Sequence, residues 1–532
     1  MRGSWPLVVQ HGSESYFVIG EGLLAESGEG RDAARVVANA ATAPPFRFSR
    51  MGPKGTGRQL GEPNRRKLGE LMAAGGGATS QIPAGFTYLG QFLDHDLTFD
   101  KTNVMLGDIV SPTQLLQARS PSLDLDSLYG AGPQDPASAK FYAADGMHLK
   151  VGKTVAADGI AAKNGFDLPR GAGTSAKAKR RAIIPDPRND ENLAVAQHHA
   201  AMIRFHNRVL DSLPASVPAA QRFTQARELV TKHYQWMVRT DYLPRICRPS
   251  AVNNVFNSGR KVFEVGATPT DVPSMPIEFS IAGFRLGHSM IRASYNWNKI
   301  FDDGFGTLDF LFTFSATSGN LGGEPRLPSN WIADFRRLYD FSEAGRADLK
   351  VPAAKFNRAK AIDTRLVDPL ANLRPQSLGA SGIPEGDPRR NLAFRNLTRA
   401  RMVRLATGQQ MAAFMKSRGV NFPKLSKAQI RDGKNGIALD ALSQKQRTAL
   451  LTDTPLWFYI LREAEFNGGV LRGVGARIVA ETFHRAIEGS QHSIVRDPAW
   501  RPTLGPNSTT FRMVDLLLFA FEGKKTLLAP VG

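Results

Sequence analysis

The amino-acid sequence predicts a mainly α-helical fold. Between residues 192 and 213, apolar side chains recur three or four positions apart, the spacing that gives a helix one buried face. Residues 222–238 and 468–487 repeat this pattern, and the whole segment 456–487 is typical of helices in a protein core. Strand-like alternation of polar and apolar residues is scarce, and no repeat of fixed period is apparent.

The segments between the expected helices predict loops, and the chain opens with an arm. Residues 1–45 have mixed polarity and an alanine-rich patch, and they end at a proline pair, so we expect an N-terminal arm there. Glycine-rich stretches at 52–63, 73–80 and 163–182 predict loops, because they offer little apolar surface to bury. The length of 532 residues fits three or four domains, or one large helical body.

The composition is that of a soluble globular protein. With 42% hydrophobic residues and 31 phenylalanines, the chain has enough apolar mass for a large core, which excludes global disorder. Cys247 is the only cysteine, so an intramolecular disulfide and a multi-cysteine zinc site are excluded. No apolar run is long enough to span a bilayer, and the N-terminus has no apolar block followed by a cleavage site. We expect a soluble protein, cytoplasmic or exported without a cleavable signal peptide.

The net charge of +20 favours contact with anionic polymers, membranes or acidic substrates. No compact basic helix and no alternation of basic and aromatic residues marks a nucleic-acid module, so we expect no specific nucleic-acid partner. A solvated basic surface is the simplest interpretation of this charge.

One histidine between two acids ends an apolar segment at residues 82–100, IPAGFTYLGQFLDHDLTFD. If this segment is helical, Gln91 and His95 share a face, Asp94 lies beside them and Asp96 points elsewhere. Taken alone, such a histidine is more often a salt-bridged surface residue. About ninety residues later, IIPDPRNDEN opens the long helix and places Arg188 and Glu191 one turn apart. Taken alone, that segment is typical of a helix start, where acidic side chains interact favourably with the helix dipole.

Together these two segments closely resemble the distal motifs of the animal haem peroxidase family, whose pattern is QxxDHD followed by an arginine three residues before a glutamate. Cleavage of iron-bound peroxide needs a group that takes a proton from one oxygen and returns it to the other, and imidazole does both near neutrality. The resemblance gives that role to His95, with Gln91 beside it. A permanent cation stabilises charge on the departing oxygen, which is the role expected of Arg188.

The resemblance also implies covalent attachment of haem b, because Asp94 and Glu191 match the carboxylates that form ester bonds to haem methyl groups. A third, sulfonium link in a mammalian member uses a methionine after the glutamate. Here that position is Asn192, which has no sulfur, so the sulfonium link is expected to be absent.

A second histidine lies in the apolar segment IEFSIAGFRLGHSMI, residues 277–291, where the alternative is an ordinary core histidine. The segment is similar to the proximal motif of the family, which implies that His288 binds the haem iron and Arg285 pairs with a propionate. An axial imidazole needs an acceptor on its other nitrogen. The later motif NLTRAR is similar to the family's NIQRGR, which implies that Asn396 accepts from His288 and that Arg399 reaches a propionate.

The loop RSPSLDLDSLYG, residues 119–130, is rich in oxygen ligands of the kind that calcium prefers. A polar loop with a modest helix cap is the alternative. The resemblance implies one calcium site whose ligands come from this loop and from the acid after His95. These ligands are Asp96, Ser120, Ser122, Asp124 and Asp126, with Ser122 using its carbonyl and Asp126 replacing a hydroxyl of the mammalian pattern.

The motifs run in family order from about residue 82 to 408, which implies one large, mainly α-helical peroxidase domain over 46–532. The member would be of a bacterial-like type without disulfides. The implied reaction reduces hydrogen peroxide to water and oxidises an organic donor or a halide. Two alternatives stay open: a fatty-acid dioxygenase of the same superfamily, and a non-catalytic haem- or calcium-binding adhesion protein. Arg285 stands where cyclooxygenases carry their radical tyrosine, and His95 with Arg188 is unnecessary for haem storage, so the peroxidase is favoured.

Overall fold

Helices dominate the computed structural model, which describes residues 46–57, 60–102, 104–269, 271–374, 377 and 382–532. The arm predicted over residues 1–45 lies outside the described residues. The longer helices are α2 (Glu62–Met72), α3 (Gly85–Leu97), α6 (Leu193–Ser212), α7 (Ala219–Met237), α9 (Pro249–Ser258), α14 (Leu392–Met402), α15 (Gly408–Ser417), α17 (Gln444–Thr452), α18 (Leu456–Glu465), α19 (Gly473–Glu488) and α20 (Met513–Ala520). The mainly helical fold is therefore confirmed.

The remaining helices are short and lie within long loops. They are α4 (Asp126–Tyr129), α5 (Ala176–Arg180), α8 (Leu243–Ile246), α10 (Ile277–Ile281), α11 (Gly287–Met290), α12 (Leu308–Thr313), α13 (Asp368–Ala371), α16 (Lys427–Asp432) and α21 (Lys525–Leu528). Two 3₁₀ turns bear on the site: η4 (Pro187–Asp190) and η6 (Gly283–Leu286). No helix in the described residues combines the length and the apolar composition needed to cross a bilayer.

The described strands form four two-stranded pairs that connect distant parts of the chain. One pair is parallel, β1 (Phe48–Ser49) with β5 (Met275–Pro276). Three pairs are antiparallel: β2 (Thr79–Pro83) with β8 (Arg358–Lys360), β3 (Gly152–Lys153) with β4 (Asn164–Asp167), and β6 (Ser294–Tyr295) with β7 (Gly306–Thr307). Such short strands agree with the scarcity of strand-like alternation in the sequence.

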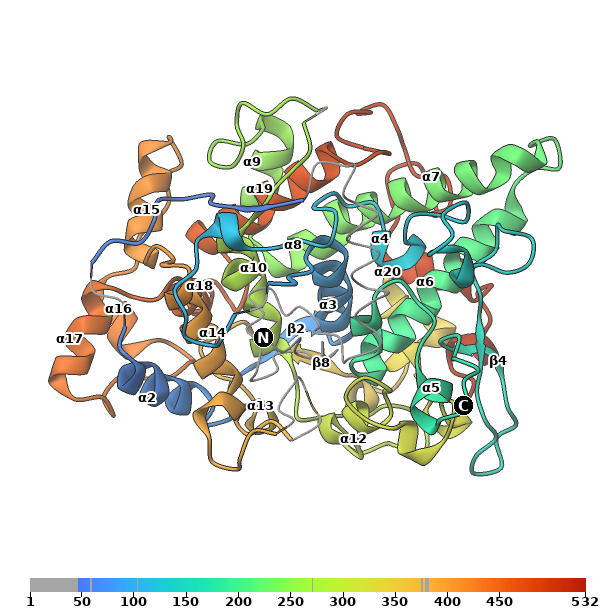
Figure 1. The fold of residues 1–532 in the computed structure, drawn as a ribbon, viewed down its shortest axis with the longest axis horizontal. Coiled ribbons are helices and arrows are strands. Elements are labelled where there is room, and N and C mark those ends of the chain that lie inside the picture. The colour runs from blue at the N-terminus through green and yellow to red at the C-terminus, as the bar shows by residue number, and fades with distance from the viewer. Residues whose placement is uncertain (1–45, 58–59, 103, 270, 375–376, 378–381) are drawn as a thin grey trace, which may run out of the picture.

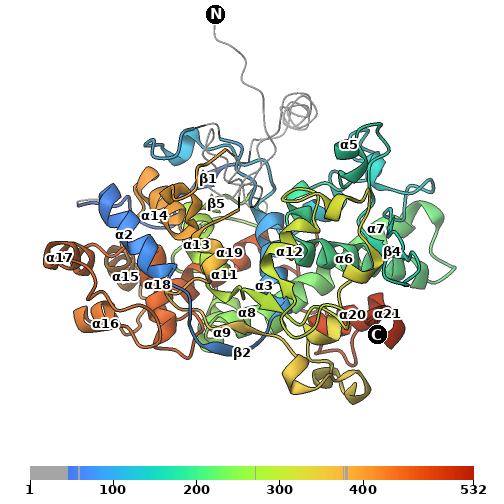
Figure 2. The same cartoon turned by 90° about the horizontal axis from the view of Figure 1, so that it is seen from below.

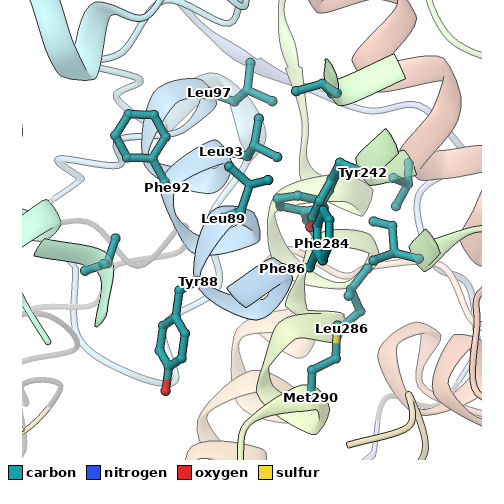
Figure 3. Packing of buried hydrophobic residues seen from close by; sticks show 14 of the residues in the cluster. Phe86, Tyr88, Leu89, Phe92, Leu93, Leu97, Tyr242, Phe284, Leu286 and Met290 are labelled. Carbon is teal, nitrogen blue, oxygen red and sulfur yellow. The ribbon is translucent and has the colours of Figure 1, made fainter. Parts of the chain in front are cut away.

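Helix α3 lies at the centre of the molecule, between a group formed by α2, α14 and α18 and a group formed by α6 and α7 (Figures 1 and 2). Its side chains Leu89, Leu93 and Leu97 form a stripe at i, i+4 spacing that points toward Tyr242 and Phe284 (Figure 3). A side chain at position 90 would place its Cβ 2.4 Å from the Tyr242 hydroxyl, so only glycine allows this approach.

The other side of α3 is covered by aromatic rings. The ring of Phe92 lies 5.8 Å from that of His199 and 6.2 Å from that of Tyr234, both in edge-to-face arrangements. Packing on both sides leaves α3 little freedom to shift, so the polar residues that it carries are held in fixed positions.

Two sequence predictions are refined by helix boundaries. The helix expected from residue 468 begins at Gly473, because Gly468 and Gly469 adopt the left-handed conformation and end the preceding segment in a turn. The helix expected to carry Arg188 begins only at Leu193.

Candidate haem and peroxide site

Helix α3 contains all four residues of the predicted distal motif, Gln91, Asp94, His95 and Asp96. The helix ends at Leu97, and the backbone amide and hydroxyl of the next residue, Thr98, both donate to the carbonyl of Asp94 at 2.9 Å. This double contact closes the last turn directly around the motif. The His95 side chain is fully buried, which excludes the surface salt bridge considered from the sequence.

Arg188 lies in the turn η4 and not on α6, which corrects the prediction that the long helix carries it. The Asp186 carboxylate accepts from the backbone amide of Arg188 at 3.0 Å and so caps this turn, with Pro187 at its first position. Asn192 has extended backbone and caps α6 separately, by accepting from the amide of Val195 at 2.9 Å. Two independent caps therefore split the predicted helix start into a turn and a helix.

The Arg188 guanidinium is buried in a cluster of charges. It donates to both oxygens of Asp186, at 3.0 and 2.7 Å, and Arg119 donates to the same carboxylate at 2.7 Å. Burial raises the pKa of Asp186, but the two arginines outweigh burial and hold this pKa well below its usual range. Burial likewise opposes the charge of Arg188, and Asp186 outweighs it, so the pKa of Arg188 is raised.

Arg188 also fixes the end of α3. Its Nη2 donates to the backbone carbonyls of His95, at 3.0 Å, and Thr98. A cation at the C-terminal end of a helix is favoured by the helix dipole. Its Nη1 is buried and has no hydrogen-bond partner. The guanidinium is thus locked through two nitrogens and keeps donor capacity on the third.

An amide connects His95 to a second buried histidine. His95 Nδ1 lies 2.9 Å from Oδ1 of Asn189, and Nδ2 of the same amide lies 3.0 Å from Nδ1 of His199. With the amide in this orientation, its oxygen accepts from Nδ1–H of His95, which leaves the lone pair of the imidazole on Nε2. That Nε2 lies 4.0 Å from Oε2 of Glu191. Burial lowers the pKa of His199 to about 3, so His199 stays neutral and can accept from the amide.

The two predicted ester-forming acids and Gln91 contact further polar groups of the site. Arg285 Nη1 lies 3.4 Å from Oδ2 of Asp94, and its Nε donates to the carbonyl of Ser280 at 2.7 Å. Glu191 is fully buried, and its carbonyl accepts from the Ser315 hydroxyl. The side-chain oxygen of Gln91 accepts a hydrogen bond from the side-chain amide of Asn192 at 2.8 Å. This bond joins helix α3 to the residue that caps α6.

On the proximal side, the structure brings Asn396 of α14 to His288 of α11. Nδ2 of Asn396 lies 2.9 Å from Nδ1 of His288, and Nη1 of Arg399 lies 3.5 Å from Oδ1 of Asn396. The expected acceptor role of Asn396 requires the amide to be turned by 180°, which puts its oxygen at the position of its nitrogen. The pairing predicted between two segments 108 residues apart is present.

The predicted calcium ligands lie around the start of α4, where Asp96, Ser120 and Ser122 are buried and Asp124 and Asp126 are partly exposed. Asp96 accepts from Ser127 and from the amide of Leu125, and Asp124 accepts from Ser490 and the amide of Gln491. Ser122 donates its hydroxyl to the carbonyl of Gly489, while Ser120 accepts from the amide of Ser122. Within the described ranges, no group of three or more His, Cys, Asp or Glu side chains has an arrangement that would hold a metal ion.

Electrostatics nevertheless couple these acids. Burial raises the pKa of Asp96 to about 7 and that of Asp124 to about 6, and the negative charge of Asp126 adds to both shifts. The carboxylate of Asp126 thus acts on both Asp96 and Asp124.

Sequence reasoning missed two residues of the distal site. Asp186 and Asn189 flank Arg188 in the polar run DPRND, and this density of polar residues beside an apolar helix was the available signal. His199, interpreted from the sequence as structural, contacts Asn189. Its neighbour His198 diverges from it as expected and contacts the Tyr339 hydroxyl at 2.7 Å.

Comparison with known proteins points to one family. The family model described as animal haem peroxidase matches residues 98–308. This match supports the animal haem peroxidase superfamily. Rat thyroid peroxidase is 26% identical over 192 residues, which cover 34% of this chain and 20% of that protein. Heme peroxidase 2 of Caenorhabditis elegans is 24% identical over 182 residues, or 32% of this chain and 24% of that protein. The matched part therefore spans a fifth to a quarter of these relatives.

Solved structures extend the likeness in fold to nearly the whole chain. Peroxidase A from Dictyostelium discoideum has a TM-score of 0.59 at 15% identity and covers 91% of this chain and 94% of that one. A fatty acid alpha-dioxygenase from Arabidopsis thaliana has a TM-score of 0.52 at 11% identity, covering 99% and 83%. The single animal haem peroxidase-like domain is confirmed. At these identities, the likeness concerns the fold alone.

We expect Asp186→Asn to lower the free energy of unfolding by about 3–5 kcal/mol, because it leaves Arg188 and Arg119 buried beside a neutral group. The native pKa of Asp186 is depressed, so its stabilisation is present above the unfolded pKa of about 3.9 and is lost as pH falls through the native value. The difference in unfolding midpoint between variant and wild type should be constant over about pH 5–8.

The matched control is Asp432→Asn, which removes an acid paired with Arg431 on the surface and should change the midpoint little. Equal effects of the two substitutions would contradict a special role for Asp186.

Proposed function

We propose that this chain is a haem peroxidase that reduces hydrogen peroxide to water while it oxidises an organic donor or a halide. The observation that carries the proposal is the orientation of His95, whose Nδ1 is held by Asn189 so that Nε2 keeps its lone pair. The position of Arg188 at the end of the same helix supports it.

The buried groups fit a haem that needs both a ligand and polar contacts. Arg188 Nη1 is a buried donor without a hydrogen-bond partner, and a side chain built at Gly287, next to His288, would meet no atom within 4 Å. His288 would hold the iron, and Arg285 and Arg399 would hold the propionates. When bound, the haem would supply the iron that binds peroxide and takes up its oxidising equivalents.

Asp94 and Glu191 would form ester bonds to haem methyl groups, and Asn192 would form no third link. Haem that resists extraction into acidified organic solvent after peroxide treatment would support the ester bonds. Complete extraction would contradict them.

His95 would move the proton. Its Nε2 takes a proton from one peroxide oxygen while Nδ1–H stays bonded to Asn189, and the imidazolium then returns the proton to the departing oxygen. The amide prevents the alternative tautomer, in which Nε2 carries a proton and accepts nothing. Neutral His199 holds the amide in this orientation.

Arg188 would stabilise negative charge on the departing oxygen. Its charge is permanent, and its contacts with Asp186 and with the end of α3 keep it from reorganising during the reaction. One acid, Asp186, pairs with two arginines, Arg188 and Arg119.

The alternative of a fatty-acid dioxygenase draws on the fold, which is shared with plant fatty acid alpha-dioxygenases. The residue three positions before His288 opposes it. Arg285 stands at the position of the cyclooxygenase radical tyrosine, and its side chain contacts Asp94. We therefore prefer the peroxidase.

We further propose that calcium binds among Asp96, Ser120, Ser122, Asp124 and Asp126. The support is the chemistry of the donors, which are hard oxygens, and the electrostatic effect of Asp126 on both Asp96 and Asp124. In the described structure, these acids contact Ser127, Ser490 and backbone amides. Binding would therefore require them to exchange these contacts for the ion. An ion on Asp96 would restrain the adjacent His95.

The proton role is tested by mixing the haem-loaded protein with hydrogen peroxide in stopped flow. His95→Ala should slow the spectral change by at least about a hundredfold, the scale of lost acid–base catalysis. Asn189→Leu should slow it by about ten- to a hundredfold, the range for residues that orient a functional histidine. An unchanged rate in His95→Ala would refute the function.

The pH dependence of the rate in Asn189→Asp shows whether Asn189 orients His95 or only fills space beside it. Aspartate keeps an acceptor at Nδ1, but its negative charge raises the pKa of His95, so the unprotonated form is populated only at higher pH. The acid limb of the pH–rate profile should therefore move to higher pH while the limiting rate is largely kept. A profile that stays in place would make Asn189 a packing residue only.

Ligation by His288 is tested by haem retention. His288→Ala should lose most of its haem during purification, measured as haem absorbance per protein, because the axial ligand is gone. His492→Gln, on the loop after α19, serves as a control and should retain haem. Full occupancy with an unchanged spectrum in His288→Ala would exclude this ligand.

Metal analysis tests the calcium proposal. We expect about one calcium per wild-type chain after gentle dialysis and none in Asp96→Asn, because a carboxylate ligand is lost. Asp440→Asn, an exposed control, should keep the ion. Calcium-free wild-type protein with an unchanged rate of reaction with peroxide would refute a role for calcium.

A further inference from the structure

A cavity of about 380 Å³ lies away from the candidate haem site, between α9, the loop 419–423 that follows α15, and the start of α19. None of the residues assigned above to haem, peroxide or calcium lines it. Its volume is at the lower end of the range for pockets that bind small molecules, about 300–1,000 Å³.

The lining is strongly basic. Four cationic side chains, Arg248, Lys261, Arg472 and Arg477, contribute to the lining, and no acidic residue does. An adjoining cavity of about 300 Å³ shares Val420, Asn421 and Phe422 with the first and adds Lys416 and Lys424. Two neighbouring lobes with cations and no acid favour a ligand that carries more than one negative charge.

Arg477 makes this cavity more than a basic surface patch. Its side chain is nearly completely buried, with 4% exposed. Nε is bonded to Glu481, and Nη1 donates to Oδ1 of Asn254, another lining residue, at 2.6 Å. Nη2 is buried and has no hydrogen-bond partner. Leaving such a donor unpaired is costly, and Arg477 lines the cavity, so its guanidinium favours an anionic oxygen as a further partner.

The acidic side chains near the cavity already accept hydrogen bonds from other groups of the protein. Glu481 accepts from the backbone amides of Lys261, Val262 and Phe263 as well as from Arg477. Glu463 accepts from the first amides of α19, at Val474 and Gly475. Glu481 thus balances Arg477, while the charges of Arg248, Lys261 and Arg472 remain for a ligand.

We propose that this cavity is a binding site for a small molecule with at least two anionic groups, phosphate or carboxylate. The guanidinium of Arg477 would receive one anionic oxygen, and the exposed cations at the rim would receive the second group. The half-buried ring of Phe422 offers an apolar face to the body of the ligand. The site does not depend on the proposed peroxidase activity.

The test is isothermal titration calorimetry of the full-length, haem-loaded chain with two probes, inorganic pyrophosphate and citrate. Binding of either with one site per chain is expected, and the probe that binds more tightly tells whether phosphate or carboxylate is preferred. The double variant Arg248→Gln/Lys261→Gln, at two exposed lining positions, should weaken binding by about tenfold or more. Arg472→Gln should weaken it further.

The control removes the same charge elsewhere. Lys427→Gln/Lys445→Gln changes two exposed lysines on α16 and α17, outside both cavities, and should leave the affinity within about twofold. The proposal is overturned if neither probe binds, if several molecules bind per chain, or if the control weakens binding as much as the lining variants. A circular dichroism spectrum of each variant verifies that it is folded.

Discussion

The distal site depends on one buried carboxylate, that of Asp186. It caps the turn that carries Arg188, pairs with the guanidinium of Arg188, and pairs with Arg119 from the loop that leads to the calcium candidates. Through Arg188 it also reaches the carbonyls at the end of α3. Three segments distant in sequence are thus joined through a single anion, which offsets the cost of burying the two arginines.

The same turn carries the amide that contacts His95. Arg188 and Asn189 are neighbours, so the residue that supplies the cation and the residue that fixes the imidazole tautomer move as one unit. Because the turn is separate from α6, Asn189 does not follow the helical repeat of α6, and its amide contacts both His95 and His199. The proposed acid–base and electrostatic functions therefore share one short, rigid structure.

Much of the fold and part of the candidate site could be predicted from residue types and from their periodicity in the sequence. The face of α6, the helix bearing His95 and the pairing of His288 with Asn396 follow from apolar spacing and from motif resemblance, because those features are local or are shared by the family. The roles of Asp186, Asn189 and His199 depend on contacts between segments, such as the 94 residues that separate His95 from Asn189. Such contacts leave no periodic pattern. The break between the turn and α6 was likewise hidden, because it depends on which of several polar residues acts as the cap.

The net charge of +20 has to be carried by solvent-facing groups, because the buried cations are largely matched. Arg188 meets Asp186, Arg285 meets Asp94, Arg170 meets Asp167 and Asp190, and Arg462 meets Glu465, all with side chains at most 8% exposed. Excess cations therefore accumulate at the surface, where water screens them. A cavity is the exception, since its walls reduce that screening and bring the fields of several cations together. The basic cavity beside α19 is such a place, and this is the physical reason why a small anion would bind there more strongly than on the open basic surface.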